Sequence, residues 1–162
     1  MLRRAHLLLL KIYKSLPRRW RLFIVHRLAP SYTVGAICVV ERPDGALLLV
    51  RHSYRNAWGF PGGLLNRGEA VEAGAKREAK EECDIDVDIV GEPAVVVAPG
   101  PRRVDVIFRC TARDPELARP IPPEVTAIGW YQPDELPDLQ HEAAGALVAI
   151  ARSVHTERPA AS

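Results

Sequence analysis

The chain has 162 residues, of which 48% are hydrophobic and 26% are charged. This length and composition favour a single globular domain with a buried core and argue against a disordered or fibrous protein. Three scattered cysteines (Cys38, Cys83, Cys110) form no C-x-x-C pair, which argues against a disulfide framework or a zinc site. Because free cysteines are typical of a reducing compartment, we expect a cytoplasmic protein.

The charge is distributed unevenly between the start of the chain and the rest. Residues 1–30 carry eight Lys or Arg and no acid, so the remainder has 22 − 8 = 14 bases against 20 acids, a net charge of −6. Apolar residues recur with a helical period over 2–16, and a second short helix is predicted over 20–28, after Pro17. The sequence therefore predicts a basic helical arm over 1–30.

Three partners for residues 1–28 follow from this composition. A helical extension can pack on its own domain or on a second copy as a homodimer. A cationic helix with Leu, Ile, Trp and Phe can instead lie on an anionic membrane surface, which would make the protein peripheral at the inner membrane. Nucleic acid is disfavoured, because the arm has no recognisable reading motif and the body is acidic.

The body of the chain alternates between strand-like and helix-like segments, which indicates an α/β domain over 31–155 followed by a flexible tail over 156–162. A proline-rich polar loop is expected over 111–123. Strands are predicted over 33–40, 46–50, 85–90, 94–98, 104–110 and 125–131, and helices over 71–83 and 139–153.

Three glutamates of the helix predicted over 71–83 form a candidate metal site. Glu78, Glu81 and Glu82 are spaced i, i+3 and i+4 and therefore share one helix face. Carboxylates packed this closely repel one another. A divalent cation such as Mg²⁺, which prefers oxygen ligands, would remove that repulsion.

The same segment carries an extended motif. The pattern Gly-x5-Glu-x7-Arg-Glu-U-x-Glu-Glu-x-Gly-U, where U is aliphatic, is matched in register by Gly63, Glu69, Arg77, Glu78, Ala79, Glu81, Glu82 and Ile85. Trp58-Gly59-Phe60-Pro61-Gly62 precedes it. Asp84 replaces the usual glycine after the helix, a position that commonly needs a left-handed backbone. Asp adopts it at a cost of roughly 1–2 kcal/mol. The sequence resembles the Nudix hydrolase family.

This resemblance implies the Nudix fold, an α/β/α sandwich with a mixed sheet, here with a basic helical extension. It also implies hydrolysis of a pyrophosphate bond in a nucleoside diphosphate linked to another moiety, with Mg²⁺ or Mn²⁺. The implied metal ligands are Glu78, Glu81, Glu82 and the carbonyl of Gly62. Arg77, paired with Glu69, is implied to organise the site, and the identity of the general base is left open.

Residues outside the motif are weaker candidates. Glu124 follows two prolines, where the family often keeps another acid, and it is either a further metal ligand or a solvated loop residue. Arg51, Arg55 and Arg103 are candidates to bind phosphate, and Trp58 and Tyr54 to stack on a base, although solvated or sheet-covering roles compete. The five histidines are dispersed, and the spacing assigns none of them to chemistry.

Several alternatives remain at this stage. In the family that the sequence resembles, a proline about sixteen residues beyond the motif is associated with ADP-ribose-type members. Pro101 lies at that position, so the resemblance makes ADP-ribose or a nucleotide sugar the first substrate hypothesis. A non-catalytic nucleotide-binding domain of the same fold is the main alternative, but every motif carboxylate is present, which favours an enzyme. An isoprenoid diphosphate isomerase would need a catalytic Cys and extra His ligands, and His52 with the isolated cysteines does not form that set.

Overall fold

The computed structural model describes residue 11 and residues 13–157, and the chain divides into two compact units at Tyr32 and Thr33. The first unit contains helix α2 (Arg18–Leu28), which begins after Pro17 and has no buried side chain. Most of the helix predicted over 2–16 lies outside the described residues, although positions 13–15 are helical. No helix in the described part of the chain is both long and apolar enough to cross a bilayer.

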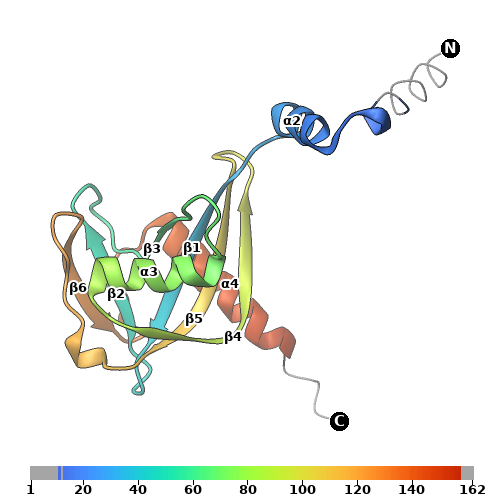
Figure 1. The fold of residues 1–162 in the computed structure, drawn as a ribbon. Helices are drawn as coiled ribbons and strands as arrows, with labels where there is room; N and C mark the ends of the chain where they lie inside the picture. Colours follow the sequence, from blue (N-terminus) through green and yellow to red (C-terminus); the bar gives the residue numbers. More distant parts are fainter. Residues whose placement is uncertain (1–10, 12, 158–162) are drawn as a thin grey trace, which may run out of the picture. The chain divides into compact units, whose positions relative to one another are not determined.

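The second unit is built on one mixed sheet with the strand order β4-β5-β1-β2-β6, to which β3 adds by pairing with β1 (Figure 1). The strands are β1 (Thr33–Glu41), β2 (Leu47–His52), β3 (Gly62–Leu64), β4 (Val87–Ala98), β5 (Arg103–Ala112) and β6 (Val125–Tyr131). β1 and β5 run parallel along the whole length of β1, and all other pairs are antiparallel.

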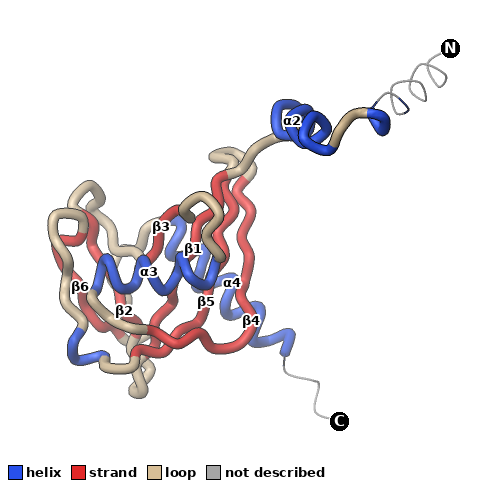
Figure 2. The backbone as a smooth tube through the Cα atoms, viewed as in Figure 1, coloured by secondary structure: helices blue, strands red, loops and turns tan. Residues whose placement is uncertain are grey.

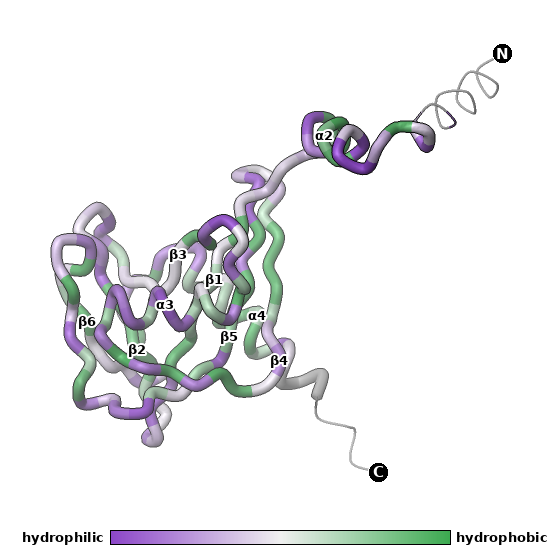
Figure 3. Tube along the Cα trace, in the orientation of Figure 1, coloured by the Kyte–Doolittle hydropathy of each residue, from purple (hydrophilic) through white to green (hydrophobic). Residues whose placement is uncertain are grey.

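Two helices cover opposite faces of this sheet, α3 (Val71–Cys83) and α4 (His141–Glu157), as Figures 1 and 2 show. Side chains alternate between the faces with a period of two: Ala36, Cys38 and Val40 of β1 pack on the α3 side, and Ile37 and Val39 on the α4 side. Because both faces are buried, the central strands are almost continuously apolar, whereas α3 and the loops carry many polar residues (Figure 3). The predicted α/β/α sandwich with a mixed sheet is confirmed.

Small residues let α3 lie close to the sheet. Ala75, Ala79 and Cys83 are fully buried against it. Gly74 is unfavourable for helix propensity by about 1 kcal/mol relative to Ala. A Cβ at this position, however, would collide with the side chain of Leu65. Glycine at 74 therefore serves the packing between the helix and the loop before it.

The end of α3 has the geometry that the motif predicted. Asp84 adopts a left-handed backbone conformation (φ 52°, ψ 31°), and its N–H donates to the carbonyl of Lys80. Its carboxylate forms ion pairs with Lys80 at 3.0 Å and with Arg119 at 2.5 Å. These contacts offset part of the backbone cost of placing a residue with a Cβ here.

Other elements differ from the prediction. The strand predicted over 85–90 begins at Val87, and it forms one strand with 94–98, β4, whose register against β5 shifts between Val90 and Ala94. A bulge of this kind interrupts the alternation that marks a strand in the sequence. β3 was not predicted, because three residues that include two glycines give no periodic signal. A 3-10 turn (Pro115–Leu117) lies within the predicted loop. The helix predicted over 139–153 is α4 (His141–Glu157), which includes the first two residues of the predicted tail, and the remaining tail lies outside the described residues.

The sheet opens a space for the site beside β1. β1 pairs with β2 at Glu41 and Leu47, near the turn that joins them, whereas its first half pairs with β3. The segment before β3 bridges to β2 through Gly59 and Val50. Residues 59–64 are therefore held between β1 and β2, next to the N-terminal half of β1.

Candidate active site

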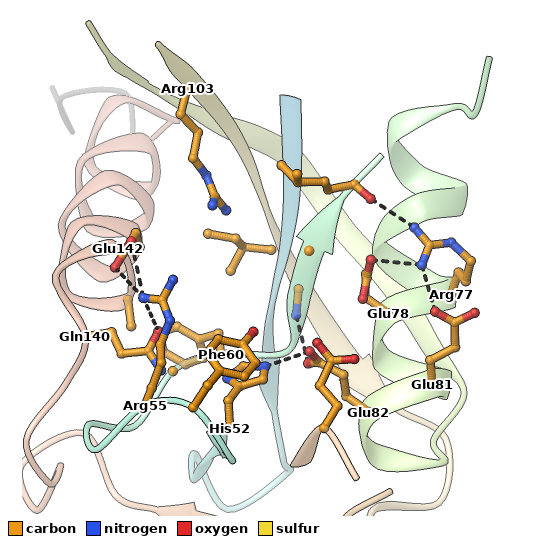
Figure 4. Close-up of a pocket in the computed structure, with 18 of the residues that line it drawn as sticks. His52, Arg55, Phe60, Arg77, Glu78, Glu81, Glu82, Arg103, Gln140 and Glu142 are labelled. Carbon is orange, nitrogen blue, oxygen red and sulfur yellow. Dashed lines mark hydrogen bonds and ion pairs between the residues drawn. The ribbon is translucent and has the colours of Figure 1, made fainter. Parts of the chain in front are cut away.

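A cavity of about 540 Å³ lies between α3 and the start of α4, and residues 59–64 contribute to its lining (Figure 4). One side carries Glu78, Glu81, Glu82 and Glu124, which we call the carboxylate wall. The other side carries Arg55 and Arg103 with Gln140 and Glu142, which we call the arginine wall. The cavity therefore places anionic and cationic groups opposite one another.

Glu82 is the most deeply buried member of the carboxylate wall, with 4% of its surface exposed. Its Oε1 lies 2.7 Å from Nε2 of His52. Its Oε2 accepts a hydrogen bond of 3.1 Å from the backbone N–H of Gly62. Because each oxygen has its own partner, the carboxylate is fixed in orientation and still has free lone pairs for an ion.

Glu78 lies on the preceding turn of α3, with a side chain that is 13% exposed. Burial raises its pKa, and the guanidinium of Arg77, which donates to Glu78 Oε1 at 2.8 Å, acts in the opposite direction. A Cβ at Gly63 would come within 2.5–2.9 Å of the Glu78 carboxylate. Glycine at 63 therefore leaves the space in which this carboxylate lies.

Arg77 connects several acids on the outer side of the helix. Its Nε and Nη2 donate to the two oxygens of Glu69 at 2.8 and 3.0 Å, so the predicted ion pair is present and bidentate. Its Nη1 donates to Glu78 at 2.8 Å and to Glu81 at 2.7 Å. Hydrogen bonds from Arg77 and from the N–H of Asn66 lower the pKa of Glu69 to about 2.

The three helix glutamates therefore do not have equal environments. Glu81 is 59% exposed and pairs with Arg77 four residues earlier, whereas Glu82 is buried and Glu78 is partly buried toward the cavity (Figure 4). The shared helix face predicted from the spacing thus separates into one buried carboxylate, one partly buried carboxylate and one at the exposed edge.

His52 and Glu124 complete this wall, although they are distant from α3 in the sequence. Ligand atoms of His52, Glu82 and Glu124 all lie within 4.8 Å of one another. The N–H of Ser53 donates to the backbone carbonyl of Glu124 at 2.8 Å, which holds the two loops together. The hydrogen bond to Glu82 raises the pKa of His52.

The sequence does contain a signal for His52, which lies in the alternation of β2 and not in the spacing of the histidines. Leu48 and Val50 of β2 pack on the α3 side of the sheet, and position 52 continues this alternation. An imidazole at the next inward position therefore points to the side on which the glutamates lie.

The arginine wall combines residues from three separate segments. Arg55 Nη1 donates to Gln140 Oε1 at 3.1 Å and to Glu142 at 3.4 Å, across the start of α4. Arg103 begins β5 and donates through Nε to Asp105 at 2.7 Å. Both guanidinium groups line the cavity, as the sequence hypothesis for phosphate binding requires.

Two other predicted substrate-binding residues lie elsewhere. The guanidinium of Arg51 lies over the ring of Trp58, 5.7 Å from its centroid, and Trp58 packs edge-on against Tyr131. Neither Arg51 nor Trp58 lines the cavity. The residues that do line the cavity include Tyr54, Phe60, Gln140 and Glu142. Of these four, the sequence hypothesis named only Tyr54, as a base-stacking residue.

The donor atoms suit a hard divalent cation. Glu78, Glu82 and Glu124 offer carboxylate oxygens, and Gly62, whose N–H holds Glu82, carries the carbonyl implied as a ligand. Oxygen-rich sites of this kind are those that Mg²⁺ and Mn²⁺ occupy. Burial of two carboxylates on one side of the cavity is the arrangement that a bound cation would stabilise.

Comparisons with known proteins agree with this geometry. The NUDIX domain model matches residues 31–150. A MutT-like protein from Streptomyces ambofaciens is 33% identical over 113 residues, which cover 70% of this chain and 72% of that protein.

Solved structures show the same fold. A NUDIX hydrolase from Nitrosomonas europaea is 25% identical, with a TM-score of 0.69 over 82% of this chain and 77% of that one. An ADP-ribose pyrophosphatase from Streptococcus suis is 23% identical, with a TM-score of 0.65 over 81% and 96% of the two chains. The family model covers most of the chain, and the chain belongs to the Nudix hydrolase family.

Proposed function

We propose that this enzyme hydrolyses a pyrophosphate bond in a nucleoside diphosphate linked to another moiety, with Mg²⁺ or Mn²⁺ as cofactor. The observation that carries the proposal is the opposition of the carboxylate wall and the arginine wall across one cavity. A diphosphate would be bound from both sides. Metal ions held by the carboxylates would contact its phosphate oxygens on one side, and guanidinium groups would contact them on the other.

Glu78, Glu82, Glu124 and the Gly62 carbonyl would hold the metal, with Glu81 at the edge of the set. A bound divalent ion neutralises phosphate charge and lowers the pKa of a coordinated water. A glutamate of the carboxylate wall would accept the proton of the attacking water. Arg77 and Glu69 keep Glu78 in place and do not contact the reacting atoms.

The proposed substrate class is ADP-ribose or a nucleotide sugar. The position of Pro101 favours this class, and the solved structures of similar fold include the ADP-ribose pyrophosphatase from S. suis and a UDP-X diphosphatase. A cavity of about 540 Å³ lies in the range of small-molecule sites, roughly 300–1,000 Å³. Arg55 and Arg103 would bind the phosphate oxygens.

A substrate panel tests the proposal. Purified protein is incubated with ADP-ribose, UDP- and ADP-sugars, dinucleoside polyphosphates and nucleoside triphosphates, with Mg²⁺ or Mn²⁺, and released phosphate is measured after phosphatase treatment. We expect turnover of a diphosphate-linked substrate that disappears with EDTA. Tight binding of a nucleotide without turnover would instead support the non-catalytic nucleotide-binding alternative.

For the basic arm we propose a contact with anionic membrane. Trp20, Phe23 and Leu28 of α2 are exposed, and residues 1–30 contain cations but no acid. Exposed aromatic and cationic groups on one helix are typical of helices that bind at a lipid surface. A second copy of the chain is the competing partner.

Deletion of residues 1–28 should leave hydrolysis largely intact and abolish sedimentation with phosphatidylglycerol vesicles. A change of oligomer size without any change in sedimentation would favour the homodimer. Loss of turnover in a cooperatively folded deletion variant would place the arm in the active site.

A further inference from the structure

His52 is a buried imidazole at the base of the cavity, and the proposed reaction gives it no role. It is 6% exposed and ends β2, beside Glu82 of the carboxylate wall (Figure 4). A polar side chain is costly to bury unless its partners compensate. The partners of His52 therefore indicate its role in the site.

A bulge in β6 lies beside His52, whereas β2 keeps its alternation through this residue. β2 pairs regularly with β6 up to Arg51 and Ala127, but His52 pairs with Val125, so Thr126 is left opposite no residue. The hydroxyl of Thr126 donates to the carbonyl of Arg51 at 2.9 Å and holds this bulge. Because the extra residue belongs to β6, the alternation of β2 directs the His52 side chain to the α3 side of the sheet.

The hydrogen bonds around Glu82 determine where the proton of His52 lies. Gly62 N–H donates to Oε2 of Glu82, and Oε1, 2.7 Å from Nε2 of His52, is the second acceptor of the same carboxylate. Nε2 must therefore carry a hydrogen. The other ring nitrogen, Nδ1, is buried and has no hydrogen-bond partner among the described residues, so Glu82 provides the hydrogen bond of the imidazole, whose ring also packs against Tyr54.

We propose that His52 is a positioning residue that holds Glu82 in the orientation needed to bind the divalent cation. The inference rests on the proposed function, because it takes Glu82 as a ligand. His52 and Gly62 hold the two oxygens of the carboxylate, and Gly62 also offers its own carbonyl to the ion. His52 at the end of β2 and Gly62 at the start of β3 therefore hold two donor groups, the Glu82 carboxylate and the Gly62 carbonyl, close to one another. Groups that orient a metal ligand typically change metal affinity between about 10-fold and about 100-fold when they are removed.

The experiment measures Mn²⁺ affinity of the full chain from the electron paramagnetic resonance signal of free Mn²⁺. We expect His52→Leu to weaken Mn²⁺ binding between about 10-fold and about 100-fold. His52→Gln, whose amide N–H has a similar reach, should recover most of the loss. The matched control is His141→Leu at the exposed start of α4, which should bind Mn²⁺ like the unmodified protein.

Electron spin echo modulation of the Mn²⁺ complex distinguishes positioning from ligation. A positioning role predicts no directly bound nitrogen in the unmodified protein. A strong nitrogen coupling that disappears in His52→Leu would make His52 a ligand and overturn the inference.

The remaining outcomes are also decisive. No Mn²⁺ binding by the unmodified protein would defeat the proposed function itself. Normal binding by His52→Leu, or equal losses in His52→Leu and His52→Gln, would defeat only the role of the hydrogen bond. Thermal melts verify folding of each variant, and His52→Phe, which keeps the ring volume, replaces His52→Leu if that variant does not melt cooperatively.

Discussion

The two walls of the cavity differ in how they are assembled. The carboxylate wall is built mainly on one helix, and its buried members are each held by hydrogen bonds at 2.7–3.1 Å. The arginine wall combines a loop residue, Arg55, with the first residue of β5, Arg103, and Arg55 is held by longer contacts of 3.1–3.4 Å. We infer that the first wall is rigid before substrate binds and that Arg55 is adjusted by it, whereas Arg103 is held by Asp105 at 2.7 Å.

Removing a buried ligand should produce the largest effect and tests the rigid wall directly. Glu82→Gln replaces a carboxylate by a neutral amide in the proposed ligand set, and metal catalysis is worth several kcal/mol. We therefore expect turnover to fall by about 100-fold or more. Steady-state kinetics measure the change. Glu72→Gln, an exposed substitution in the first turn of the same helix, serves as the control and should keep normal turnover.

Weakening the support of the carboxylate wall should have the next largest effect. Arg77→Lys keeps the charge but cannot reproduce the fork that binds Glu69, Glu78 and Glu81. We expect kcat/KM to fall between about 10-fold and about 100-fold, with weaker Mn²⁺ binding. Unchanged kinetics would show that this wall does not depend on its outer ion pairs.

The arginine wall should respond through KM. Arg55→Ala or Arg103→Ala removes a charge-assisted contact worth about 1.5–3 kcal/mol, so we expect KM to rise by about 10-fold or more with a smaller change in kcat. Arg51→Ala is the matched control, because Arg51 lies outside the cavity. A rise in KM for Arg51→Ala alone would place substrate on the opposite side of Trp58.

The smallest predicted effect is on acid stability. Because the pKa of Glu69 is lowered to about 2, its stabilising contribution is complete above its unfolded-state pKa and is lost as the pH falls toward 2. Glu69→Gln should therefore melt at a lower temperature than the unmodified protein at pH 6. The gap should narrow between about pH 5 and pH 2. A gap that stays constant across this range would show that the ion pair does not stabilise the fold.

The sequence predicted the two walls unequally, for a physical reason. Glu78, Glu81 and Glu82 lie on one helix, whose geometry converts spacing into position, and the predicted bounds of α3 and the left-handed Asp84 are confirmed. The arginine wall depends on tertiary contacts among Arg55, Arg103 and the start of α4. Arg51 and Arg55 could not be distinguished by type or spacing, although only Arg55 lines the cavity.

His52 and β3 illustrate two further limits. The alternation of β2 indicates the direction of the His52 side chain, but its role depends on a partner thirty residues away. β3 exists because β1 offers it a pairing edge, and its own three residues have no strand signal. Both features arise from neighbours in space, which local sequence patterns do not record.

Gly63 and Asp84 show that two positions at which one motif usually has glycine can require it for unrelated reasons. Position 84 requires a left-handed backbone conformation, which aspartate also adopts, so glycine can be replaced there. Position 63 has no room for a Cβ, and any side chain there would have to displace the Glu78 carboxylate. Related sequences with a residue other than glycine at the first position should therefore fold normally and lack hydrolase activity, whereas variation at the second should be compatible with catalysis.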